Sequence, residues 1–359
     1  MNGIDESSGS SARAADSAPP VIDIHAHALP AALLDEVTAR EVDGVSAARA
    51  DGGWLVSLPG SPAPRLVRPL MADAGRRAAW AADRGLTTQV VSPWLDAQPT
   101  AAMPEAAARD WARRLNAALT EQEQGQGQGQ DTGHAVLATV ALTSQAGSDL
   151  RQAVEEDGLA GLVLSTNPAG VTDLADPALE DLWETAAGLG VPVVLHPPAD
   201  GPARALPDSA EFGNTFCRLV DTTFAVTKLL LSGVLDRHPA LRLVVVHGGG
   251  FLPYQSMRLD GGHRADALSG YRIERDRPSD YLQDLYFDTV ALRSASIRFL
   301  AGVAGAGHVL LGSDYPFPLG DPDPAGTVRA AGLRPADTAS VLGANARRLF
   351  PTALWSPAR

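Results

Sequence analysis

Four segments of the sequence end a run of apolar residues on a side chain that can bind a metal ion or move a proton. The runs and their polar ends are Val21–Ile24 with His25 and His27, Val193–Leu195 with His196, Leu243–Val246 with His247, and Val309–Leu311 with Asp314. A polar side chain is a costly end for a buried strand unless something there requires it. Because the four segments lie far apart in the sequence, they predict one shared site at one end of a barrel.

The spacing of the first two histidines favours metal binding. His25 and His27 are two residues apart, and side chains at positions i and i+2 of a strand share a face. With His196 and Asp314 they offer three imidazole nitrogens and one carboxylate, a set suited to zinc or a similar divalent ion. Asp23 lies outside this set, and we expect it to be a buried carboxylate that braces the loop.

His247 allows three interpretations, because it precedes the glycines 248–250, which permit unusual backbone angles and a close approach of substrate. It could be a further metal ligand, a general base or a buried histidine of the core. The other four groups already fill a metal shell, so we favour the general base. A catalytic zinc lowers the pKa of a bound water toward neutrality, and a neutral imidazole within reach could take its proton.

Composition narrows the class of partner. The chain has 359 residues, 45% of them hydrophobic, and a formal net charge of −13. Such an acidic surface disfavours nucleic acid and anionic membranes, whereas a small anionic substrate can still bind where cations line a pocket. The single cysteine excludes an internal disulfide. Residues 1–20 are rich in Ser, Ala, Asp and Gly and predict a disordered tail. They lack the cationic start and apolar middle of a signal peptide, so we expect a cytoplasmic protein.

Strand-like and helix-like patterns alternate along the chain. Eight apolar runs predict strands: Val21–Ile24, Leu86–Val91, Ala135–Ala141, Gly161–Leu164, Val191–Leu195, Leu243–Val246, Leu285–Phe287 and His308–Leu311. The runs are continuous, as in parallel sheets that are buried on both faces. Helical patterns at Met103–Gln122, Ala178–Leu189 and Phe216–Leu231 lie between them. We therefore expect an α/β fold, a (β/α)8 TIM barrel, as a single domain over residues 21–359.

Two segments depart from a regular repeat. Residues 28–85 separate the first two strands, and Gly52–Ser57 and Arg65–Val67 predict a small β-insertion, at about residues 31–67, that forms part of the pocket wall. The Gln/Gly alternation at Gln122–Gln130 predicts a flexible surface loop with no role in chemistry.

Several longer motifs resemble a known family. They are Ile22–Pro30, Leu195–Pro197, Leu231–Leu235, His247–Gly250, Leu311–Gly320 and Gly343–Ala346. Over nearly all of residues 21–350 the chain resembles the amidohydrolase superfamily, in its branch of metal-dependent decarboxylases. Within that branch it is most similar to the enzymes that act on aminocarboxymuconate semialdehyde.

The resemblance implies a role for each site residue. It makes His25, His27, His196 and Asp314 the ligands of one Zn2+ per subunit, with other divalent ions as alternatives, and His247 the acid/base, with Asp314 sharing in the return of the proton. It also implies that Arg68 and Arg258 hold substrate carboxylates and that Arg258 acts across the interface of a homodimer. Pro198, where related enzymes carry a Trp, and the unusual segment Ala199–Phe212 depart from the family pattern.

The expected function is zinc-dependent, non-oxidative decarboxylation of a carboxylated conjugated acid, with 2-amino-3-carboxymuconate 6-semialdehyde or a close analogue as the expected substrate. One alternative keeps the site but changes the reaction to metal-dependent hydrolysis of a lactone, amide or ester, because fold does not fix reaction. A second alternative is a non-catalytic barrel that serves as a binding module.

Overall fold

The computed structural model describes residues 19–126, 133–169 and 171–351. Residues 1–18 of the expected tail, and residues 127–130 of the Gln/Gly segment, lie outside the described part of the chain.

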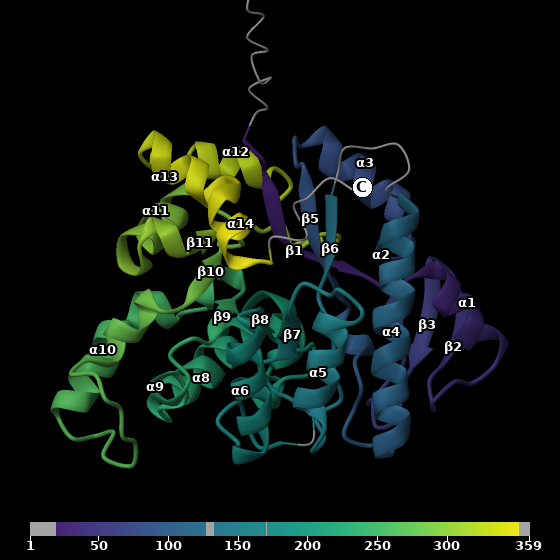
Figure 1. The fold of residues 1–359 in the computed structure, drawn as a ribbon, viewed down its shortest axis with the longest axis horizontal. Coiled ribbons are helices and arrows are strands. Elements are labelled where there is room, and N and C mark those ends of the chain that lie inside the picture. The colour runs from purple at the N-terminus through teal and green to yellow at the C-terminus, as the bar shows by residue number, and fades with distance from the viewer. Residues whose placement is uncertain (1–18, 127–132, 170, 352–359) are drawn as a thin grey trace, which may run out of the picture.

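Eight parallel strands form a closed barrel, as the sequence predicts. They are β1 (Ile22–Ala28), β5 (Thr88–Pro93), β6 (Gly133–Val136), β7 (Leu162–Ser165), β8 (Pro192–His196), β9 (Arg242–Val245), β10 (Tyr286–Asp288) and β11 (Val309–Leu310). One sheet has the order β1-β5-β6 and the other β11-β10-β9-β8-β7. Parallel bridges from Ala26 to Tyr315 and from Ala138 to Leu162 join the two sheets into the ring seen in Figure 1.

The continuous apolar runs reflect two hydrophobic layers. In β8, Val194 belongs to one buried cluster together with Ile22 and Ile24, whereas its neighbours Val193 and Leu195 belong to another. Successive side chains of a strand point to opposite faces, so β8 is apolar on both.

Helices surround the barrel. Their bounds are α1 Ala31–Ala39, α2 Pro69–Ala72, α3 Ala74–Asp83, α4 Glu105–Gln126, α5 Ala146–Glu155, α6 Glu180–Leu189, α7 Ser209–Phe212, α8 Arg218–Leu231, α9 Val234–Arg237, α10 Leu252–Arg264, α11 Ser294–Ala304, α12 Pro324–Arg329, α13 Pro335–Ala339 and α14 Asn345–Leu349. The three expected helices correspond to α4, α6 and α8. In the described part of the chain, no helix is both long and apolar enough to cross a membrane.

The end of α4 corrects one expectation. The helix continues to Gln126, so the predicted loop at Gln122–Gln130 is wrong for its first five residues. Gln is a good helix former, and a single Gly in a helix costs only about 1 kcal/mol relative to Ala.

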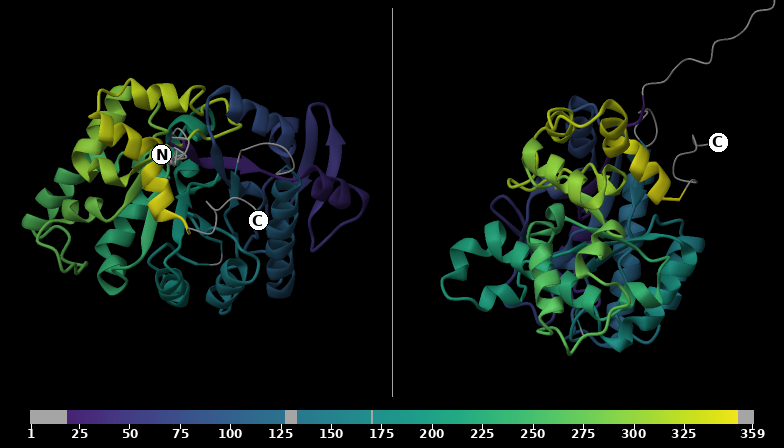
Figure 2. Two further views of the ribbon diagram at one scale, coloured as in Figure 1. Left: turned by 45° about the horizontal axis from the view of Figure 1, so that its top comes forward. Right: turned by 90° about the vertical axis from the view of Figure 1, so that its left-hand side faces the viewer.

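The insertion after β1 is a small layer of its own. Helix α1 is followed by an antiparallel sheet of β2 (Ser46–Ala50), β3 (Gly53–Ser57) and β4 (Arg65–Val67), of which the sequence had indicated only the last two strands. Trp54, Val56 and Val67 pack with Leu33 and Leu34 of α1. The insertion lies on the opposite side of the molecule from α10 (Figures 1 and 2).

Candidate metal centre and active site

Strand β1 brings two histidines to one point. His25 and His27 are both buried, and their Nε2 atoms lie 3.0 Å apart. Both side chains lie on the same face of the strand, as the i, i+2 spacing predicts.

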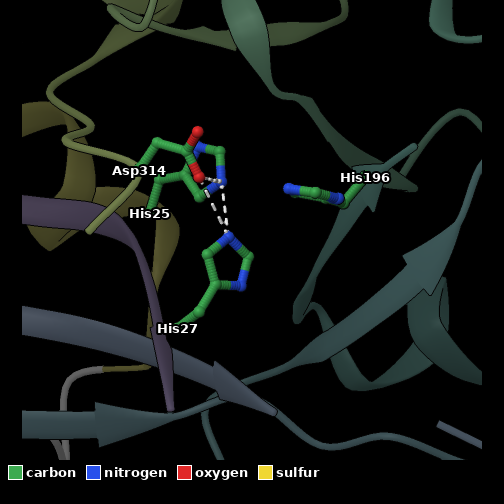
Figure 3. Close-up of side chains that lie close together, drawn as sticks. All are labelled: His25, His27, His196 and Asp314. Atoms are coloured by element: carbon green, nitrogen blue, oxygen red, sulfur yellow. Dashed lines mark hydrogen bonds and ion pairs between the residues drawn. The ribbon is translucent and has the colours of Figure 1, made fainter. Parts of the chain in front are cut away.

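Two other strands complete the cluster. His196 is the last residue of β8, and Asp314 lies four residues beyond β11. The Oδ1 atom of Asp314 lies 3.3 Å from Nε2 of His25 and 3.2 Å from Nε2 of His27. One potential ligand atom from each of the four residues lies within 4.8 Å of the others, with His196 facing the other three (Figure 3). The sequence therefore predicted correctly which four side chains meet.

The three histidines present the same nitrogen to the centre because the Nδ1 atom of each faces a hydrogen-bond acceptor. These pairs are His25 with Oδ2 of Asp288 at 2.6 Å, His27 with Oγ of Ser92 at 3.0 Å, and His196 with the backbone oxygen of Pro197 at 2.8 Å. An imidazole that donates from Nδ1 leaves the Nε2 lone pair available as a ligand.

These residues fit a divalent cation. Nε2 of His196 and Oδ1 of Asp314 are buried without a hydrogen-bond partner, and buried polar atoms normally have one. In the tautomers just described, three nitrogen lone pairs and a carboxylate converge, and a shared cation would satisfy all of them. The donor set, three imidazoles and one carboxylate, is typical of zinc and of neighbouring transition metals.

The electrostatics of the cluster favour a bound positive charge. Burial would raise the pKa of Asp314, but the charge of His25 and the proximity of His247 hold that pKa well below its usual value. Burial lowers the pKa of His27 to about 4 and also lowers that of His196. Burial opposes a charge on His25 too, yet Asp314 and Asp288 together raise its pKa. A metal ion at this point would compete with a proton for Nε2 of His25.

Asp23 braces the loops below the ligands, as expected. Its carboxylate accepts hydrogen bonds from the backbone N–H of His25 at 3.0 Å, from Nε2 of Gln89 at 2.8 Å and from Oγ of Ser313 at 2.6 Å. The hydrogen bonds from Gln89 and Ser313 connect β1 to β5 and to the loop after β11. This carboxylate therefore fixes the relative positions of His25 and Asp314.

Asp288 is a further residue of the site and is not among the residues predicted from the sequence. It ends β10 and is fully buried, and besides His25 it accepts the backbone N–H of Gly248 at 2.8 Å. A Cβ atom on Gly312 would come within 3.1 Å of the Cβ atoms of both Asp288 and His25, so the glycine makes room for this pair. The missed signal was an Asp at the end of an apolar strand, the same kind of signal that identified the four candidate metal ligands.

His247 lies beside the four-residue cluster. Its Nε2 atom is 3.6 Å from Oδ2 of Asp314, too far for a direct hydrogen bond, and its Nδ1 atom is buried without a partner. His247 and Asp314 have backbone φ angles of 55° and 60°. Such angles are uncommon for residues other than glycine, and backbone strain of this kind concentrates at functional sites.

A cavity of about 310 Å³ opens onto this side of the cluster. His247 and Asp314 line it, and Phe251, Val290 and Leu319 are among its apolar lining residues. Its volume and mixed lining suit a small organic molecule.

The two arginines implied by the family resemblance are both exposed. Arg68 is exposed and precedes α2 at the end of the insertion. Arg258 is exposed on α10 and lines a separate cavity with Thr223, Gln255 and Leu268. Within one chain, neither arginine lines the cavity at His247.

The unusual segment after β8 is tied to its surroundings. The backbone N–H of Ala199 donates to Asp96 at 3.2 Å, and Asp200 forms an ion pair with Arg65 of the insertion. The ion pair connects this loop to the insertion, and the hydrogen bond connects it to the segment that follows β5.

The sequence matches the Amidohydrolase family over residues 22–352. It is 29% identical over 184 residues to 2-amino-3-carboxymuconate-6-semialdehyde decarboxylase of Dictyostelium discoideum, a match that covers 50% of this chain and only 49% of that protein. It is 27% identical over 300 residues to gamma-resorcylate decarboxylase of Polaromonas sp. strain JS666, covering 80% of this chain and 90% of that protein.

A solved structure has the same fold. The 5-carboxyvanillate decarboxylase of Novosphingobium aromaticivorans, complexed with manganese and 4-hydroxy-3-methoxy-5-nitrobenzoic acid, has a TM-score of 0.75 and 19% sequence identity. The match covers 92% of this chain and 95% of that one. The chain belongs to the amidohydrolase family, in its branch of metal-dependent, non-oxidative decarboxylases.

Proposed function

We propose that this chain, folded as one domain over residues 21–359, is a zinc-dependent decarboxylase of a small conjugated acid. The first candidate substrate is 2-amino-3-carboxymuconate 6-semialdehyde or a close analogue, on the basis of the relative from Dictyostelium discoideum. The observation that carries the proposal is the convergence of three Nε2 atoms and one carboxylate beside a histidine that is left over for proton transfer.

His25, His27, His196 and Asp314 would hold the metal ion. The ion supplies Lewis acidity, which polarises an oxygen of the substrate and lowers the pKa of a bound water. The nitrogen-rich ligand set favours zinc, while the manganese in the Novosphingobium enzyme makes Mn2+ the main alternative.

His247 would move the proton of the reaction. When a carboxylate leaves as CO2, its bonding electrons stay on the carbon, and that carbon must receive one proton. Nε2 of His247 faces Asp314 and the cavity, so it can deliver this proton as a general acid after acting as a base earlier in the cycle. Asp314 can share this role because its second oxygen lies toward His247.

Arg68 and Arg258 would bind substrate carboxylates through their guanidinium groups, which match the geometry of a carboxylate. For Arg258 this requires a homodimer in which α10 of one subunit reaches the site of the other. The exposed position of Arg258 supports that role, as do Phe224 and Met257 on the adjacent α8 and α10, each 67% exposed. Large exposed apolar side chains often mark a protein interface.

The test is an assay of the zinc-loaded protein with two acids, 2-amino-3-carboxymuconate 6-semialdehyde and gamma-resorcylate. We expect CO2 release from the first, together with loss of its near-UV absorbance, and slower or no release from the second. The His247→Asn variant serves as a control that retains the metal ligands.

The hydrolase alternative predicts the opposite pattern. Turnover of a panel of lactones, amides and esters, with no CO2 from either acid, would contradict the decarboxylase proposal and leave the metal site intact. A protein that takes up no divalent ion and turns over none of these compounds would be a binding module.

A further inference from the structure

Arg218 places a positive charge in the cavity beside the metal centre. It is the first residue of α8 and follows a π-helical turn at Gly213–Cys217. Its side chain lines the same cavity of about 310 Å³ as His247 and Asp314. Of the described residues around this cavity, Arg218 is the one whose side chain is always charged. The sequence pattern of Phe216–Leu231 predicts only a helix and indicates no role for Arg218.

Within the described part of the chain, no ion pair neutralises the positive charge of Arg218. Its guanidinium forms no ion pair or side-chain hydrogen bond with any described residue, although the residue is half-buried. Asp221 lies three residues further along α8, where burial raises the pKa of its carboxyl group and the charge of Arg218 acts to lower it. The carboxylate does not bond to Arg218, and its Oδ1 atom instead accepts the backbone N–H of Ala203 at 2.7 Å. A half-buried guanidinium with five donors and no protein partner is suited to an anionic ligand.

The rest of the cavity indicates what kind of anion fits. Its walls include the apolar side chains of Leu219, Phe251 and Leu319, and Asn214 and Ser296 add polar groups. The metal centre and Arg218 therefore border one apolar space. A flat, conjugated molecule with one acidic group at the metal and a second acidic group at Arg218 would satisfy both.

We propose that Arg218 binds a second carboxylate of the substrate, one that stays on the product, and so makes this enzyme selective for diacids over monoacids. The inference rests on the proposed function, because it takes the carboxylate that leaves to be the one at the metal centre. It differs from the roles proposed for Arg68 and Arg258, since Arg218 belongs to the cavity of its own subunit.

Two probes isolate the second carboxylate. In 4-hydroxy-3-methoxy-5-nitrobenzoate, the planar nitro group imitates the carboxylate at the metal, and the benzoate carboxylate imitates the one that is retained. Its methyl ester has the same ring and nitro group but lacks the second charge. Calorimetric titration of the manganese-loaded protein gives the Kd of each probe without any need for turnover.

We expect the wild-type protein to bind the acid about tenfold or more tightly than the ester, the effect of one charge-assisted contact. In Arg218→Gln, the Kd of the acid should rise by about the same factor, while that of the ester should change less than about twofold. Arg298→Gln is the matched control, because Arg298 is exposed on α11 and does not line the cavity. It should behave like the wild type.

Three results would overturn the assignment. The first is a preference for the acid that persists in Arg218→Gln. The second is an equal loss of acid and ester binding, which would mean that Arg218 only shapes the cavity. The third is loss of the preference in Arg68→Gln or Arg258→Gln but not in Arg218→Gln, which would leave the decarboxylase proposal standing. Failure of both probes to bind the metal-loaded wild type would contradict the proposed function as well.

Discussion

The Nδ1 atom of His25 lies 2.6 Å from the Oδ2 atom of Asp288, and both side chains are buried. This hydrogen bond fixes the ring of His25 so that its Nε2 atom faces the other ligands, and it makes that nitrogen a stronger ligand. Asp288 also accepts the backbone N–H of Gly248, next to His247. One carboxylate therefore positions both a metal ligand and the loop that carries the proposed proton donor.

Replacing Asp288 by Asn should weaken metal binding by about 10- to 100-fold, the usual effect of removing such a partner of a ligating histidine. The measurement is a titration of the metal-free protein with Zn2+ in competition with a chelator of known affinity. Asp110→Asn is the control, because Asp110 is exposed on α4. Equal Zn2+ affinities for Asp288→Asn and wild type would show that this hydrogen bond does not strengthen metal binding.

Removing the metal should lower the stability of the wild-type protein. An ion that binds only the folded state stabilises it by about 2.7 kcal/mol when its free concentration is 100 times its Kd. We expect added Zn2+ to raise the melting temperature of the metal-free wild type and to have much less effect on His196→Ala, which loses one ligand. The same rise in both proteins would place the stabilising ion elsewhere.

Replacing His247 by Asn should slow CO2 release by about 10²- to 10⁴-fold, the range for loss of a general acid or base. Metal content should stay at the wild-type level, because four other residues hold the ion. Metal analysis and rate assays on the same sample separate the interpretations of His247. A parallel loss of metal would make it a ligand, and an unchanged rate would make it a residue of the core.

The proposed sharing of Arg258 between subunits can be tested by mixing two inactive variants, Arg258→Ala and His247→Ala. Random exchange gives mixed dimers in which one of the two sites has both residues intact, so activity should recover to about a quarter of wild type. The control is each variant carried alone through the same exchange. If mixed dimers form and activity does not return, Arg258 does not act across the interface.

The residues that end hydrophobic strands were the most predictable part of the site. His25, His27 and His196 follow or end continuous apolar runs, and the closed barrel brings the ends of such strands together. Strands such as β8 could be predicted for the same reason, since successive apolar residues fill both of its faces. Asp288 obeys the same rule, but it ends a strand of only three residues and has no histidine beside it in the sequence, so its signal is weaker.

Other features could not be predicted because they depend on tertiary structure. The positive φ angles of His247 and Asp314 follow from how the loops pack, since side-chain type alone disfavours them. Arg218 gave no signal, because an arginine in an amphipathic helix normally faces solvent. Only the three-dimensional structure shows that Arg218 lines the same cavity as His247 and Asp314.

The central claim is that the cluster of His25, His27, His196 and Asp314 is a metal centre that removes a carboxylate. Its most direct test is the release of labelled CO2 from carboxyl-labelled 2-amino-3-carboxymuconate 6-semialdehyde, measured for the metal-free protein, the zinc-reconstituted protein and reconstituted His196→Ala. We predict one CO2 per substrate from the reconstituted wild type and almost none from the other two. CO2 release at the same rate without metal, or none from a wild type with one bound ion per chain, would contradict the account.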